Sequence, residues 1–156
     1  MADPLVGVLG ATGAVGGVVL DVLAERNFPL RDLVPLASSR SAGSTIKFRG
    51  QDLTVREATP EAFAGIDVLF SAVGSSTSRE LAPHAVQAGA VVIDKTSAWR
   101  YDDDVPLVIP EVNPGDIDWH KGIISCPNCS TIQMVMALTP IEREYGIERV
   151  VVATYQ

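Results

Sequence analysis

The chain has 156 residues, of which 47% are hydrophobic and 20% charged, and its formal net charge is −7 at pH 7. This balance is typical of one soluble globular domain, and an acidic chain without a basic run argues against nucleic acid or an anionic membrane as partner. No apolar run reaches the roughly 18 residues that span a bilayer, and the first residues lack the features of a signal peptide, so we expect a cytoplasmic protein.

Short apolar runs alternate with segments of helical periodicity along the chain. We expect strands over 4–10, 32–38, 67–73, 90–96, 106–112, 122–126 and 147–156, with two short strands around Gly50 within 44–58. We expect helices over 14–26, 60–65, 78–89 and 130–146. This alternation predicts an α/β fold, Rossmann-like and doubly wound, whose mostly parallel sheet has helices on both faces. Because the last run is a strand with no tail, we expect the first domain of a longer protein.

A glycine-rich turn joins the first predicted strand to the first helix. Gly10, Gly13 and Gly16 allow a tight turn and a close approach of the backbone to a pyrophosphate, and Thr12 adds a hydroxyl donor. The strand–turn–helix context favours a dinucleotide site over a turn needed only for packing.

The turn after the second strand indicates which dinucleotide binds. NAD sites usually place a carboxylate there, whereas this chain has Ser38, Ser39, Arg40 and Ser41, which suit a 2′-phosphate and predict NADP. The alternative is an exposed arginine in a solvated loop. Gly74 and Ser75 lie in a second small-residue turn, which we expect to contact the cofactor. The alternative, which is compatible with binding, is a helix N-cap by Ser75, Ser76 or Thr77.

Cys126 and Cys129 admit four interpretations: a redox dithiol, half of a zinc site, one catalytic thiol with a neighbour, or two inert thiols. Thioredoxin-like chains do not begin with a dinucleotide-binding glycine loop, which argues against a redox dithiol. A zinc site would need further ligands, and His84 and His120 lack ligand spacing, so we expect no metal. Cys126 ends a strand, whereas Cys129 falls at a helix start, where N–H groups stabilise a thiolate and an oxyanion. Facing a nicotinamide, such a thiolate adds to an aldehyde, hydride leaves to the cofactor, and a thioester remains.

Six stretches spaced along the chain resemble aspartate-semialdehyde dehydrogenases. They are "GATGAVGG" (10–17), "SSRSAG" (38–43), "DKTSAWR" (94–100), "VPLVIPEVN" (105–113), "PNCST" (127–131) and "ATYQ" (153–156). The resemblance implies a phosphorylating aldehyde dehydrogenase that reversibly converts aspartate semialdehyde, phosphate and NADP to aspartyl phosphate and NADPH, in lysine, threonine and methionine biosynthesis. It implies that residues 1–156 are the NADP-binding domain, with the start of the catalytic domain near 129–156 and the rest of that second domain absent from this chain.

The resemblance also implies roles for single residues. Cys129 matches the nucleophile that carries the thioacyl intermediate, Arg100 and Asn128 match the phosphate site, and Gln156 matches a glutamine that positions the substrate. The matching cofactor residues are Gly10, Thr12, Gly13, Ala14, Val15, Gly16, Arg40 and Ser41. Neither histidine matches the family's general acid–base histidine, so this chain alone should bind NADP without turnover. The family usually forms a dimer through the second domain, so the resemblance implies a homodimer for the parent enzyme.

Two alternatives stay open at this point. N-acetyl-glutamyl-phosphate reductases have a similar architecture, but glycine usually precedes their cysteine, where this chain has "PNCST". The other alternative is a non-catalytic NADP-binding module.

Overall fold

A computed structural model describes residues 2–155 and has a six-stranded parallel sheet at its centre. In spatial order its strands are β5 (Arg56–Glu57), β2 (Asp32–Ala37), β1 (Leu5–Leu9), β6 (Val68–Ser71), β7 (Val91–Asp94) and β8 (Ile123–Ser125). The chain runs from β1 to β2 on one side and later to β6 on the other. The carboxyl end of β1 is therefore the switch point at which doubly wound sheets bind ligands.

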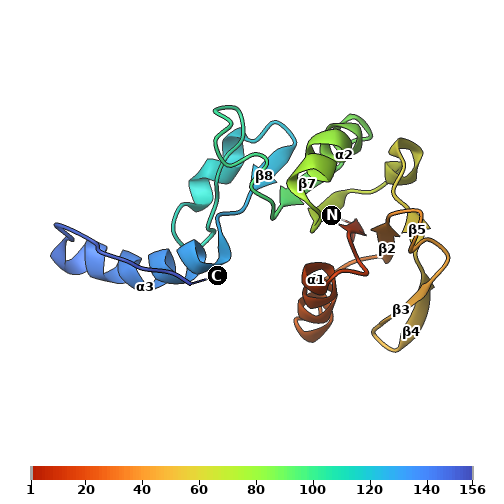
Figure 1. Cartoon of the computed structure of the whole chain (residues 1–156), viewed down its shortest axis with the longest axis horizontal. Helices are drawn as coiled ribbons and strands as arrows, with labels where there is room; N and C mark the ends of the chain where they lie inside the picture. The colour runs from red at the N-terminus through yellow and green to blue at the C-terminus, as the bar shows by residue number, and fades with distance from the viewer. Residues whose placement is uncertain (1, 156) are drawn as a thin grey trace.

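Helices cover both faces of the sheet, as predicted (Figure 1). Alternate residues of β1 point to opposite faces: Val6 and Val8 pack with helix α1 (Ala14–Glu25), and Leu9 packs in the core that contains helix α2 (Ser75–Gln87). The predicted α/β class with helices on both faces is confirmed.

The predicted hairpin around Gly50 is also confirmed. Strands β3 (Thr45–Phe48) and β4 (Gln51–Thr54) pair antiparallel across Arg49 and Gly50, whose φ angles are 49° and 79°. Positive φ at both turn residues matches the right-handed twist of the two strands. The chain also has 3₁₀ helices η1 (Pro60–Phe63), near the predicted 60–65 helix, and η2 (Pro114–Trp119), which was not predicted.

The predicted strand over 106–112 is wrong. Only Leu107 forms a bridge, parallel to Ser125 of β8, while the Asn113 side chain accepts from Ile109 N and donates to Leu107 O. Pro106 and Pro110 supply no N–H groups, so a longer ladder cannot form here.

The last helix, α3 (Cys129–Tyr145), extends away from the sheet and has no buried residue (Figure 1). The chain then turns at Gly146 and runs back along α3. The predicted strand over 147–156 is wrong for residues 147–155, because a strand needs a paired neighbour and none of the described residues pairs with them. Within residues 2–155, no helix is both long and apolar enough to cross a membrane.

Candidate active site

Backbone crowding explains two glycines of the first turn. Gly10 has φ +87°, and a Cβ there would lie 2.6 Å from the Ala72 carbonyl oxygen of the β6–α2 turn. A Cβ on Gly16 would lie 2.1 Å from the Gly10 carbonyl oxygen. The glycines therefore bring the β1–α1 turn, the β6–α2 turn and the first turn of α1 into close contact.

Two helices begin beside this turn, and neither is capped by a side chain. The N-caps are Gly13 for α1 and Gly74 for α2, which have no side chain to accept a hydrogen bond from the first N–H groups of the helix. The first N–H groups of a helix have no partner within the helix and carry a partial positive charge. Both helix starts therefore offer donors to an anion such as a pyrophosphate.

A hollow of about 490 Å³ lies at the carboxyl ends of β1, β2 and β6. Six of the predicted cofactor residues line it: Gly10, Thr12, Gly13, Ser38, Ser39 and Gly74. This hollow fits a bound dinucleotide, because it lies at the switch point of the sheet, beside the glycine-rich β1–α1 turn and the starts of α1 and α2.

Six other predicted cofactor residues do not line this hollow. Ala14, Val15 and Gly16 form the first turn of α1, and Val15 lines a separate apolar hollow that also contains Lys95 and Cys126. Arg40 and Ser41 lie in the turn after β2, with Arg40 exposed. The Ser75 hydroxyl lies 3.0 Å from that of Ser97.

Other residues that line this hollow were not predicted as cofactor contacts, among them Glu57, Ala58, Glu80 and Leu81. Glu57 pairs with Ala37 at the end of β2, through the short edge strand β5. A carboxylate is therefore present close to the strand end where ribose hydroxyls are usually bound, although none directly follows β2. Only the general rule that ligands bind at the carboxyl ends of neighbouring strands could have indicated Glu57.

Arg100 lies at the carboxyl ends of β7 and β8, and backbone carbonyls hold its side chain. Its Nε donates to Cys126 O at 3.0 Å and its Nη2 to Lys95 O at 3.3 Å. No partner for Nη1 is found among residues 2–155. The guanidinium is thus fixed beside the Cys126–Cys129 turn while part of its donor fork remains available to an anion.

The two cysteines differ in environment and are not joined by a disulfide. Burial raises the pKa of the Cys126 thiol above its ordinary value, and nearby Lys95 and Arg100 oppose this only partly. Cys129 is exposed and is the first residue of α3, as the sequence predicted. Because the thiolate is the nucleophilic form, burial disfavours Cys126 as a nucleophile.

Asn128 caps α3 and fixes the start of the helix. Its Oδ1 accepts from Ser130 N at 3.0 Å and from the Ser130 hydroxyl at 2.6 Å. Another hollow, of about 390 Å³, lies between this helix start and the segment after Gly146 that runs back along α3. It is lined by Asn128, Ser130, Thr131, Met134, Val152 and Thr154. Gln156 lies outside the described residues.

The fold and the dinucleotide hollow have a counterpart in a known family. Residues 5–120 match the family model described as semialdehyde dehydrogenase, NAD binding domain. The chain therefore belongs to the semialdehyde dehydrogenase family and contains its NAD-binding domain. Within that family, the resemblance to aspartate-semialdehyde dehydrogenases is confirmed. The matched residues end before Cys126 and Cys129.

Three relatives illustrate the similarity. The aspartate-semialdehyde dehydrogenase of Bacillus subtilis is 55% identical over 97% of this chain and 44% of its own length. Aspartate semialdehyde dehydrogenase II of Vibrio cholerae, in a complex with ASA, is 47% identical with a TM-score of 0.91, over 94% of this chain and 49% of its own. The Candida albicans enzyme with NADP is 32% identical with a TM-score of 0.79, over 94% and 48%. The chain thus spans about half the length of these relatives.

Proposed function

We propose that this chain is the NADP-binding part of a phosphorylating aspartate-semialdehyde dehydrogenase in which Cys129 is the nucleophile. The observation that carries the proposal is the arrangement at the carboxyl edge of the sheet. There, an exposed cysteine begins a helix, beside an arginine held on the Cys126 carbonyl. The Vibrio cholerae structure with ASA and the Candida albicans structure with NADP support this substrate and this cofactor.

Cys129 performs the covalent step in this proposal. Its thiolate adds to the aldehyde carbon of aspartate semialdehyde, and the oxyanion that forms lies near the first N–H groups of α3. Loss of a hydride from that carbon leaves a thioester on Cys129. Bound NADP supplies the hydride acceptor, and the residues suited to hold it are Gly10, Thr12, Gly13, Ser38 and Gly74.

Phosphate completes the reaction at the same place. A phosphate oxygen attacks the thioester carbonyl, the carbon–sulfur bond breaks, and aspartyl phosphate leaves the regenerated thiolate. The Arg100 guanidinium is suited to bind that phosphate because its planar fork can form two parallel hydrogen bonds with the oxygens. Asn128 lies at the same helix start and lines the adjoining hollow, with Gln156 proposed as a further substrate contact.

The biological setting belongs to the proposal as well. The reaction in the reductive direction feeds the biosynthesis of lysine, threonine and methionine, and the enzyme acts in the cytoplasm as a homodimer. The names of the relatives, which are aspartate-semialdehyde dehydrogenases, support the proposed role in amino-acid biosynthesis.

The test is phosphate-dependent reduction of NADP by the complete gene product that contains these 156 residues. Aspartate semialdehyde should be a far better substrate than N-acetyl-glutamate semialdehyde. Cys129→Ala should abolish turnover, and Cys126→Ala, the matched control, should only weaken it. Preference for the N-acetylated substrate, or equal loss in both cysteine variants, would refute the proposal.

A further inference from the structure

A buried carboxylate organises the loop that carries Arg100. Asp94, at the end of β7, is 0% exposed. Its Oδ1 accepts from Thr96 N at 2.8 Å and from the Thr96 hydroxyl at 2.6 Å. The Thr96 hydroxyl in turn accepts from Ala98 N at 2.9 Å. These bonds set the path of the chain from the end of β7 to within two residues of Arg100.

The other oxygen of Asp94 holds the far end of the same loop through helix α2. Ser78, also 0% exposed, donates its hydroxyl hydrogen to Asp94 Oδ2 at 2.6 Å and accepts from Trp99 Nε1 at 2.8 Å. Because a serine hydroxyl has a single hydrogen, this arrangement requires an acceptor at Oδ2. Trp99 immediately precedes Arg100, so the carboxylate restrains the loop on both sides.

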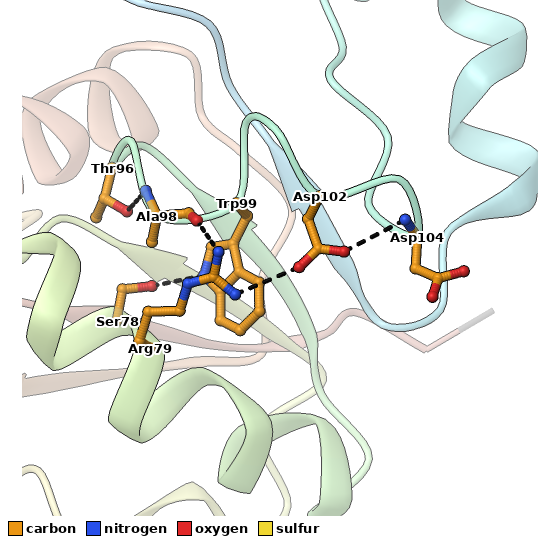
Figure 2. Close-up of polar contacts among 7 residues, drawn as sticks. All are labelled: Ser78, Arg79, Thr96, Ala98, Trp99, Asp102 and Asp104. Atoms are coloured by element: carbon orange, nitrogen blue, oxygen red, sulfur yellow. Dashed lines mark hydrogen bonds and ion pairs between the residues drawn. The ribbon is translucent and has the colours of Figure 1, made fainter.

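Helix α2 also contacts this loop at the surface, as Figure 2 shows. The Arg79 guanidinium lies 4.2 Å from the centroid of the Trp99 ring, donates to Ala98 O, and pairs with Asp102 at 3.3 Å. Both partners of this ion pair are partly exposed, so it contributes less than the buried bonds. The outer contacts therefore support the loop, and the buried network determines its position.

The backbone of Asp94 joins this loop to the cysteine turn. Its carbonyl accepts from Cys126 N at 2.8 Å, and Arg100 Nε donates to Cys126 O at 3.0 Å. We propose that Asp94 and Ser78 are positioning residues that set the Arg100 guanidinium relative to the Cys126–Cys129 turn, and thereby the affinity for phosphate. This inference rests on the proposed function, in which Arg100 binds the phosphate.

The sheet offers a matched control for the Ser78 hydroxyl. Ser71 pairs in register with Asp94, is 0% exposed, and its hydroxyl has no partner among the described residues. Ser71→Ala thus removes the same atom at the same depth as Ser78→Ala, without removing a hydrogen bond of the network. Any effect of Ser78→Ala beyond that of Ser71→Ala reports the network.

The experiment measures phosphate-dependent NADPH formation from aspartate semialdehyde with the complete gene product. Ser78→Ala and Asp94→Asn should each raise the KM for phosphate about tenfold, since each removes a hydrogen bond that fixes the loop. The KM for NADP should stay within about twofold, because the dinucleotide hollow is not lined by either residue. Trp99→Phe keeps an aromatic ring but removes the Nε1–H donor, and it should raise the KM for phosphate about threefold or less, because Ser78 still donates to Asp94.

A double variant separates positioning from general stability. If Ser78 acts through Arg100, Ser78→Ala should lower kcat/KM for phosphate much less in an Arg100→Ala background than in the wild type. Equal effects in both backgrounds, or a KM for phosphate no higher in Ser78→Ala than in Ser71→Ala, would overturn the inference. If Asp94→Asn fails to fold, Ser78→Ala decides the question. A wild-type protein without phosphate-dependent activity would instead overturn the proposed function.

Discussion

Replacing Gly16 by alanine tests how the first turn of α1 is packed, and Gly17 provides a control one residue later in the same helix. A Cβ on Gly16 would lie 2.1 Å from the Gly10 carbonyl oxygen and 2.9 Å from Ala11 Cα. Both are backbone atoms, so no side chain can rotate away. A Cβ on Gly17 would meet nothing within 4 Å.

The two variants should change stability in opposite directions. Overpacking a close-packed site costs about 1–3 kcal/mol, and because backbone must move here we expect the upper end, about 3 kcal/mol. Gly17→Ala should instead stabilise the helix by about 1 kcal/mol, the difference in helix propensity. At about 2–4 °C per kcal/mol for a chain of this size, Gly16→Ala should lower Tm by about 6–12 °C and Gly17→Ala should raise it by about 2–4 °C.

Thermal unfolding followed by circular dichroism measures both changes at one protein concentration. Titration with NADP should also show weaker binding in Gly16→Ala, since the start of α1 must move away from the Gly10 turn. Binding in Gly17→Ala should be unchanged. A Gly16→Ala variant as stable as the wild type, or equal destabilisation by both substitutions, would refute the packing argument.

Two further predictions concern charge. Arg40→Ala should weaken NADP binding about 10- to 100-fold by removing a charge-assisted bond to the 2′-phosphate, while the Kd for NAD changes less than about twofold; equal losses in a calorimetric titration would contradict this role. The raised pKa of Cys126 means that the unfolded thiol ionises at lower pH than the folded one. The contribution of the buried Cys126 thiol to the free energy of unfolding is therefore fully present below the unfolded pKa of about 8.5, and it is lost as pH rises from there through the folded pKa. Urea unfolding from pH 7 to pH 10 should show this decline in the free energy of unfolding, and the decline should be smaller in Cys126→Ala. An identical pH profile in the variant would argue against this role of Cys126.

The elements that were predicted correctly depend on neighbouring residues. The glycine turn before α1, the hairpin around Gly50 and the start of α3 at Cys129 each follow from spacing or turn chemistry within a few positions. The failures at 106–112 and 147–155 have the opposite cause. Apolar composition favours a strand, but a strand also needs a partner and N–H donors, and composition does not report either.

The amino-acid sequence by itself thus determined the fold class, the glycine-rich β1–α1 turn and the candidate nucleophile, because each depends on short-range geometry. Only the tertiary structure decided which distant side chains meet. It brings Glu57 beside β2 through an edge strand, and it joins Ser78 to Asp94 and Trp99 behind Arg100. Those contacts arise from the lateral order of strands and the packing of α2 on the sheet, which local sequence patterns do not encode.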